Sequence, residues 1–163
     1  MDQKQIIKTE KTIPAKKSVK KDYLYAVGRR REAVARVRLY AHPTDDAHWE
    51  DSPIKKQQIL VNAKPIEYYF PGQLAKAQYM KPLSLTQSFD KYAVTIKVSG
   101  GGRNGQLHAT VKGIARALAK IDPQKFRSLL KSGGFLTRDP RVRERRKVGT
   151  GGKARRKKQS PKR

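Results

Sequence analysis

The glycine-rich string at residues 100–105 is the first candidate for chemistry. It reads Gly-Gly-Gly-Arg-Asn-Gly and matches the G-x-G-x-x-G spacing of dinucleotide-binding loops. A strand is predicted before it and a helix after it, so the helix N-terminus could hold a phosphate beside Arg103. No second strand follows that helix, and the nearby acid Asp122 suits a helix cap better than a ribose contact. We therefore expect a phosphate contact without dinucleotide chemistry; the alternative is that the glycines only form a tight connection.

Histidine and carboxylate side chains gather in one polar stretch, but their spacing fits no site with a defined mechanism. His42 and His48 flank Asp45 and Asp46 in a segment without periodicity, and we predict that residues 41–57 form an inserted, acidic surface loop. Carboxylates in such a loop have no evident buried partner that would shift their pKa. We expect no catalytic residue, no metal and no cofactor.

Three consecutive arginines offer a different chemistry. Arg29, Arg30 and Arg31 stand at a predicted break between two strand segments, where irregular backbone can direct guanidinium groups toward one partner. A run of charge is usually a solvated face. A face that serves only solubility mixes charges of both signs, whereas this chain repeats separate basic runs, so we favour phosphate binding.

The charge of the whole chain points the same way. Its 163 residues include 39 Lys and Arg against 13 Asp and Glu, which gives a formal net charge of +26. Repulsion on this scale opposes compaction unless a polyanion is present. No apolar run approaches the roughly 18 residues of a membrane span, so nucleic acid is the expected partner. The absence of cysteine excludes disulfides and favours the cytoplasm, and the amino end does not resemble a secretory signal.

Hydrophobic periodicity predicts one α+β domain over residues 23–140. Alternating apolar residues predict strands over 23–39 (interrupted near 28–31), 59–61 and 92–98. Helices are predicted over 73–80, over 107–121 and over 124–131, the last with Asp122 as its N-cap.

The helix predicted over 107–121 has two different faces. Lys112, Arg116 and Lys120 lie nearly opposite the apolar face and are flanked by small residues, so we expect them to bind RNA. The apolar face spans an arc of about 80 degrees and is predicted to pack on the core. Its members are Leu107, Val111, Ile114, Leu118 and Ile121.

Both ends of the chain lack the apolar residues of a core. Residues 1–22 contain seven Lys and are predicted to be a basic extension. Residues 131–163 contain 14 Lys and Arg against Asp139 and Glu144. We expect residues 141–163 to form a basic tail that is disordered when free and ordered on RNA.

Two signatures resemble those of a known family, small-subunit ribosomal protein nine of the bacterial type. Residues 25–37, YAVGRRREAVARV, resemble its opening signature, and residues 134–141, GFLTRDPR, resemble its later one. Residues 61–62, 67–71, 98–102 and 105–106 match between them, so the resemblance spans roughly 23–163. It implies an α+β domain with a small mixed four-stranded sheet and helices on one face, similar to the second domain of ribosomal protein five.

The resemblance also implies a function, that of a non-enzymatic constituent of the small ribosomal subunit. Its partners would be small-subunit ribosomal RNA, neighbouring small-subunit proteins and, through Lys162 and Arg163 at the tail tip, peptidyl-site transfer RNA. The alternative is a general histone-like nucleic-acid-binding protein, which composition alone would allow. The residues expected to bind ribosomal RNA are Arg29, Arg30, Arg31, Arg36, Arg38, Arg103, Lys112, Arg116, Lys120, Arg138, Arg141, Arg143, Arg145, Arg146, Lys147, Arg155, Arg156, Lys157 and Lys158.

The sequence departs from the family pattern in three places. The amino extension and the insertion at 41–57 have no counterpart in it. Asn62-Ala63 replaces the usual Asn-Gly, so a left-handed turn there is expected to be slightly strained. Pro161 separates Ser160 from Lys162 where the family commonly ends Ser-Lys-Arg, and it stiffens the tail tip.

Overall fold

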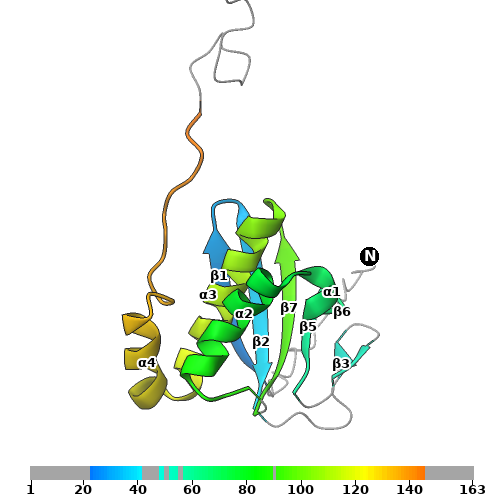
Figure 1. The fold of residues 1–163 in the computed structure, drawn as a ribbon, viewed down its shortest axis with the longest axis vertical. Helices are drawn as coiled ribbons and strands as arrows, with labels where there is room; N and C mark the ends of the chain where they lie inside the picture. The colour runs from blue at the N-terminus through cyan, green and yellow to red at the C-terminus, as the bar shows by residue number, and fades with distance from the viewer. Residues whose placement is uncertain (1–22, 42–47, 50–51, 55–56, 90, 146–163) are drawn as a thin grey trace, which may run out of the picture.

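A mixed sheet forms the centre of the fold. The structure is a computed structural model that describes residues 23–41, 48–49, 52–54, 57–89 and 91–145. The strand order in the main sheet is β1-β2-β7-β5-β6; β5 runs parallel to β7, and the other neighbours are antiparallel. Helices α2 and α3 lie in front of this sheet in Figure 1, with α4 beside them. The predicted α+β class is confirmed, while the implied likeness to the second domain of ribosomal protein five stays a prediction.

Five strands make up the main sheet, one more than the resemblance implied. They are β1 (Leu24–Arg30), β2 (Ala33–Tyr40), β5 (Ile59–Val61), β6 (Lys64–Pro65) and β7 (Ala93–Ser99). The extra strand is the two-residue β6, where the sequence indicated only a turn. The predicted break at 28–31 is a hairpin turn that begins at Arg31, whose φ is 52°. Arg29 and Arg30 therefore belong to β1 rather than to the break.

Four helices lie among the described residues. They are α1 (Ile66–Tyr69), α2 (Gln73–Leu85), α3 (Arg103–Ile121) and α4 (Pro123–Ser132). Helix α2 runs five residues beyond the predicted end and contains Pro82, a residue that ordinarily stops a helix. Pro82 is fully buried, so packing against the core compensates for the hydrogen bond that a proline cannot donate. The predicted cap of α4 is confirmed, since the Asp122 carboxylate accepts a hydrogen bond from the backbone of Lys125 at 3.2 Å.

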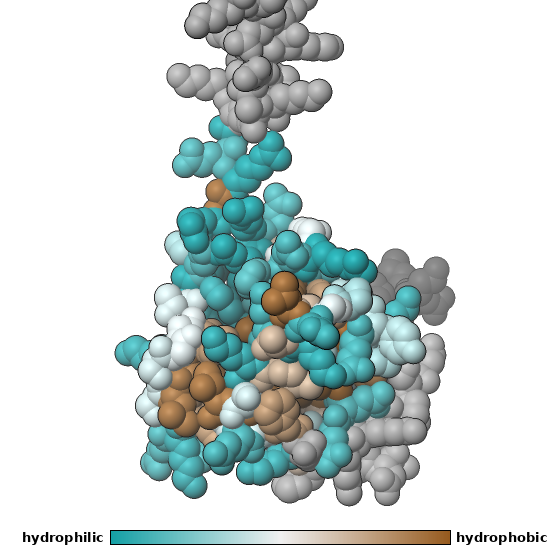
Figure 2. All heavy atoms as spheres, viewed as in Figure 1, coloured by the Kyte–Doolittle hydropathy of each residue, from teal (hydrophilic) through white to brown (hydrophobic). Residues whose placement is uncertain are grey.

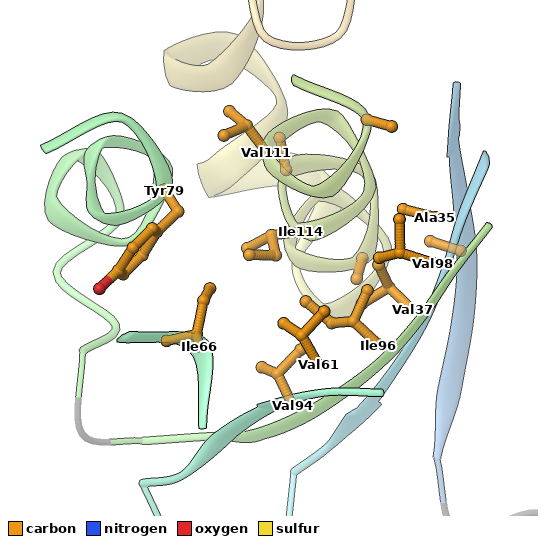
Figure 3. Close-up of a cluster of buried hydrophobic side chains, with 14 of the residues drawn as sticks. Ala35, Val37, Val61, Ile66, Tyr79, Val94, Ile96, Val98, Val111 and Ile114 are labelled. Atoms are coloured by element: carbon orange, nitrogen blue, oxygen red, sulfur yellow. The ribbon is translucent and has the colours of Figure 1, made fainter. Parts of the chain in front are cut away.

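The core lies between α3, α2 and one face of the sheet. Side chains of β2, β5 and β7 meet Ile114 of α3 and Tyr79 of α2 there (Figure 3). Of the five apolar residues predicted to pack, four are buried and Ile121 is only partly so. Ala109, Ala115 and Ala117 are fully buried as well, so α3 is covered over more of its circumference than predicted.

Small residues let α3 lie directly against β1. A Cβ on Gly28 would collide with the carbonyl oxygen of Ala109 and lie 2.5 Å from the backbone nitrogen of Gly113. A Cβ on Gly113 would lie 2.5 Å from a methyl group of Val37. Helix and strand therefore touch backbone to backbone, which only glycine at these positions allows.

The insertion contributes to a second, smaller apolar cluster on the opposite face of the sheet. Ile54, only 5% exposed, packs there with Tyr40, Leu60 and Ala93. Strands β3 (His48–Trp49) and β4 (Ser52–Pro53) pair just before it. The prediction of an acidic surface loop over residues 41–57 did not include a buried residue, because one isoleucine in a polar stretch produces no periodic signal.

The predicted left-handed turn is present at Asn62 and Ala63, with φ values of 48° and 62°. The Asn62 side chain compensates for the strain. Its Oδ1 accepts a hydrogen bond from the Val98 backbone nitrogen at 2.9 Å, and its Nδ2 donates to the Val98 carbonyl at 3.1 Å. The turn is thereby fixed to the neighbouring strand β7.

We predict that Gly28→Ala lowers the free energy of unfolding by about 1–3 kcal/mol or more, because the added methyl group meets backbone that cannot rotate away. Urea unfolding followed by circular dichroism measures the change. Gly105→Ala is the matched control: its Cβ would meet Ala33 at an ordinary 3.5 Å, and alanine favours the helix. Equal midpoints for the two variants would contradict the close helix–strand contact.

Candidate nucleic-acid interface

The glycine string joins the end of β7 to the start of α3. Gly100 and Gly101 have φ values of 73° and 64°, in the left-handed region. A Cβ on Gly100 would lie 2.5 Å from the carbonyl oxygen of Glu32, so the string packs against the β1–β2 turn. Gly102 is the N-cap of α3 and offers no capping side chain. The first N–H groups of this 19-residue helix therefore lie near Arg30 and Arg31, which line the same surface cavity as residues 101–105.

A surface cavity of about 490 Å³ opens at this junction, and we call it the glycine-loop hollow. It is lined by residues 101–105 together with Arg30, Arg31, Glu32 and Arg143. Four arginines, Arg103 included, thus line one cavity with Glu32 at a helix N-terminus, and one of them, Arg30, pairs with Asp139. This combination of directed donors and positive charge suits a phosphate group.

A chain of hydrogen bonds holds the glycine string in place. The Tyr69 hydroxyl donates to Gln106 Oε1 at 2.9 Å and accepts from Asn62 Nδ2 at 3.3 Å. Gln106 Nε2 then donates to the carbonyl of Gly100 at 3.1 Å. Sequence reasoning assigned these residues no role, although Asn62, Tyr69 and Gln106 all fall within segments that match the family.

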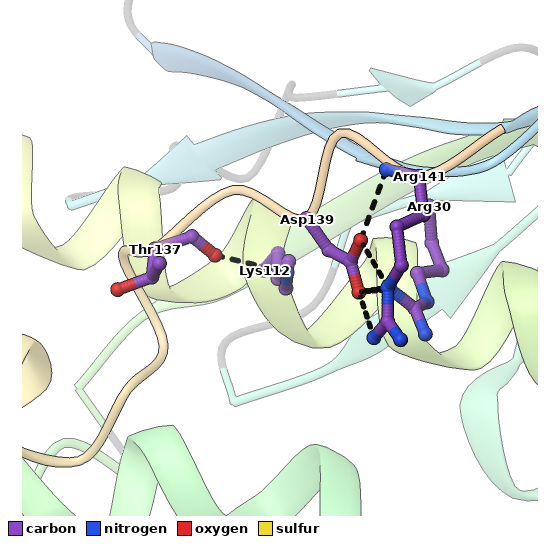
Figure 4. A network of polar contacts seen from close by, with 5 residues as sticks. All are labelled: Arg30, Lys112, Thr137, Asp139 and Arg141. Carbon is purple, nitrogen blue, oxygen red and sulfur yellow. Dashed lines mark hydrogen bonds and ion pairs between the residues drawn. The ribbon is translucent and has the colours of Figure 1, made fainter.

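Asp139 ties the segment after α4 to the domain (Figure 4). Its carboxylate pairs with Arg30 and accepts from Arg141 Nη2 at 2.7 Å. Nearby, Lys112 Nζ donates to the carbonyl of Thr137 at 2.9 Å. Arg30 and Lys112, both predicted to bind phosphate, thus also anchor the start of the basic tail. Arg141 keeps 78% of its side chain exposed.

The cationic row of α3 lies along the edge of the sheet, where β1 is the terminal strand. Arg116 Nη1 donates to the Val27 carbonyl at 3.0 Å, and Lys120 Nζ donates to the Tyr25 carbonyl at 2.7 Å. Helical periodicity placed this row opposite the apolar face, but it did not indicate that Arg116 and Lys120 bind the edge of β1. The small residues around it pack on β1 and bring the cations to the unpaired strand edge.

Positive charge is crowded where α3 meets the tail. Burial, followed by the charges of Arg30, Arg116 and Arg141, lowers the pKa of Lys112. Burial, with Arg30 and Lys112, also lowers the pKa of His108. A bound anion would relieve this repulsion and raise both values.

Arg36 and Arg38 lie apart from the glycine-loop hollow. They point to the face of the sheet away from α3, as the alternation of β2 predicts, and Arg29 of β1 shares that face. Arg29 and Arg36 are exposed. Arg38 lies 5.0 Å over the ring of Tyr23.

The tail is described as far as Arg145. Hydrophilic residues cover the end of the molecule from which the tail leaves, whereas apolar residues gather near α4 (Figure 2). Leu85 and Leu129 are among the large hydrophobic residues that are exposed. Within this part, Arg138, Arg143 and Arg145 are exposed. The predicted contacts that lie outside the described residues are Arg146, Lys147, Arg155, Arg156, Lys157, Lys158, Lys162 and Arg163.

The extension at 1–22 and His42, Asp45 and Asp46 of the insertion also lie outside the described residues. Within the part of the chain that the structure describes, no three His, Asp or Glu side chains form a metal-binding group. No described helix is long and apolar enough to cross a membrane.

Together these features define a small basic α+β protein that concentrates guanidinium groups at a helix N-terminus and along a sheet edge. The family model for ribosomal protein S9/S16 matches residues 28–163. Small ribosomal subunit protein uS9 of Maridesulfovibrio salexigens is 43% identical over 132 residues, which cover 81% of this chain and 91% of the relative. Its counterpart in Lawsonia intracellularis is 44% identical over 128 residues, covering 78% and 88%. The chain belongs to the ribosomal protein S9 family.

We predict that Asp139→Ala accelerates amide hydrogen exchange in residues 137–145, because the variant loses the contacts with Arg30 and Arg141. Mass spectrometry of peptic fragments measures the exchange. Glu67→Ala, which removes the exposed ion pair with Lys76, is the control and should leave this segment unchanged. Unaltered exchange in the Asp139 variant would show that other contacts hold the tail.

Proposed function

We propose that the chain is a structural constituent of the small ribosomal subunit that binds small-subunit ribosomal RNA and catalyses no reaction. The observation that carries the proposal is the glycine-loop hollow, a cavity at the N-terminus of α3 that four arginines line. Membership of the ribosomal protein S9 family supports the same role. The expected location is the ribosome, in the cytoplasm, with neighbouring small-subunit proteins as further partners.

Phosphate groups of the RNA backbone are the expected ligands of this hollow. Arg31 and Arg103 are exposed and carry the charges that an incoming phosphate meets first. The hydrogen bonds from Asn62 through Tyr69 to Gln106 fix the glycine string, so little order has to be created on binding. Arg29, Arg36 and Arg38 on the other sheet face would contact a separate part of the RNA.

The basic tail would extend from the domain and bind RNA inside the small subunit. Asp139 fixes its root beside Arg30, and the described chain leaves the domain as an extended segment (Figure 1). From Gly149 to Arg163 the chain can span at most about 50 Å when extended. Arg155, Arg156, Lys157 and Lys158 would bind ribosomal RNA along the way, and Lys162 and Arg163 would contact peptidyl-site transfer RNA.

We predict that Arg31→Gln with Arg103→Gln flattens the salt dependence of binding to small-subunit ribosomal RNA. Each lost phosphate contact should reduce the logarithmic slope by about 0.7–0.9. Filter binding over a range of salt concentrations measures the slope. Lys81→Gln with Lys125→Gln removes the same charge from residues that do not line the hollow.

Equal salt slopes for these two double variants would indicate that Arg31 and Arg103 are only part of a solvated surface and do not bind phosphate. The intact protein should also prefer this RNA to duplex DNA of equal length. Equal affinity for both would favour the general histone-like alternative.

We predict that deleting residues 160–163 leaves subunits assembling normally and weakens peptidyl-site transfer RNA binding roughly 3- to 10-fold, as expected for one or two charge-assisted contacts. Transfer RNA binding to purified subunits measures the effect. Lys162→Gln with Arg163→Gln keeps the length and should reproduce the loss. Unchanged affinity in both variants would indicate that Pro161 directs the tip elsewhere.

A further inference from the structure

A second surface cavity lies at the free edge of β1, between that strand, α3 and the chain around α4. Its volume is about 360 Å³, within the range of roughly 300–1,000 Å³ typical of small-ligand sites. Ala119 and Leu136, both half-buried, supply its apolar part, and Ala26 and Val27 of β1 also line it, although Ala26 is only 4% exposed. We call it the β1-edge hollow. It shares no lining residue with the glycine-loop hollow, so the two are separate places on the protein.

Three cations also line the β1-edge hollow: Arg116, Lys120 and Arg127. Arg116 and Lys120 are held in position by the carbonyls of Val27 and Tyr25. A carbonyl orients a cation without cancelling its charge. A guanidinium has five N–H donors and an ammonium three, so both groups keep donors for a ligand. No acidic residue is among those that line the hollow.

The chemistry of the β1-edge hollow differs from that of the glycine-loop hollow. In the latter, Glu32 lines the wall and Asp139 pairs with Arg30, and no apolar side chain lines it. The β1-edge hollow combines an apolar wall with cations that no lining carboxylate neutralises. A suitable ligand therefore joins an apolar body to a negative charge.

We propose that the β1-edge hollow receives one unpaired nucleotide of the bound RNA. The base lies against Ala119 and Leu136, and an adjoining phosphate meets Arg116, Lys120 and Arg127. The proposal rests on the proposed function, because it takes RNA as the ligand. It adds a preference for single-stranded RNA at this edge, since a base inside a duplex cannot leave the stack without losing its pairing.

The first test is photo-cross-linking with the full-length protein. The probe is an eight-nucleotide oligouridylate with one central 4-thiouridine, and mass spectrometry maps the cross-linked residues. We expect cross-links within residues 116–136, on the segments that line the hollow, besides any on the tails. A map with no cross-link in that range would overturn the proposal.

The second test fills the hollow without changing the charge. Ala119→Met should weaken binding of the oligouridylate severalfold, because the longer side chain occupies the space that the base would fill. Its affinity for an eight-base-pair RNA duplex should stay unchanged. Ala77→Met is the matched control, because Ala77 is exposed on α2 and lines neither hollow. An unchanged affinity of Ala119→Met for the oligouridylate, or an equal loss on the duplex, would overturn the proposal.

The third test changes the charge at the rim and does not depend on repacking. Arg127→Gln should reduce the salt slope for the oligouridylate by about 0.7, while Lys125→Gln, on the same helix outside the hollow, should not. Thermal unfolding of each variant checks its fold, and this pair decides the question if Ala119→Met does not fold. Identical salt slopes for Arg127→Gln and Lys125→Gln would contradict the contact between Arg127 and a phosphate of the RNA.

Failure of this inference can be told apart from failure of the proposed function. If the β1-edge variants bind small-subunit ribosomal RNA and the oligouridylate as the parent does, while the Arg31 and Arg103 variant loses affinity, only the nucleotide site is wrong. If the parent binds ribosomal RNA no better than duplex DNA, the proposed function itself is wrong.

Discussion

The close contact between α3 and β1 is the constraint on which the rest of the structure depends. Gly28 and Gly113 meet without side chains between them, so the helix axis lies nearer to the strand than larger residues would permit. At this distance Arg116 and Lys120 reach the carbonyls of the edge strand. The same approach sets the first turn of α3 beside the β1–β2 turn and so creates the glycine-loop hollow.

Local patterns predicted the parts of the fold that local interactions determine. The cap at Asp122 and four of the five strands of the central sheet depend on neighbouring residues and are confirmed, although the break predicted at 28–31 is a turn that begins at Arg31. The left-handed turn at Asn62 is also present, and the distant Val98 holds its side chain. The extension of α2 past Pro82 could not be predicted in this way, because tertiary burial compensates for the proline. The burial of Ile54 could not be predicted either, because the residues that it packs against lie in distant strands.

The sequence indicated which residues belong to the candidate site better than it indicated how they are arranged. The glycine string follows a strand and opens a helix as expected, which puts Arg103 at the helix N-terminus, but the sequence did not predict that Arg30, Arg31 and Arg143 line the same hollow. Helical periodicity placed Lys112, Arg116 and Lys120 on one stripe, but periodicity does not tell which element lies beside that stripe. The edge of β1 and the tail root occupy that place, and the hydrogen bonds of the three residues follow from it.

The way these cations are held links folding to binding. Carbonyl acceptors orient Arg116, Lys120 and Lys112 but leave their charges in place, and the lowered pKa of Lys112 reflects this repulsion together with burial. Asp139 neutralises part of the charge of Arg30 and Arg141 at the start of the tail, and these ion pairs hold that segment on the domain without a bound partner. Elsewhere the repulsion persists until an anion neutralises it. A polyanion that binds the folded chain therefore also stabilises the fold, since it removes a cost that the folded arrangement of cations creates.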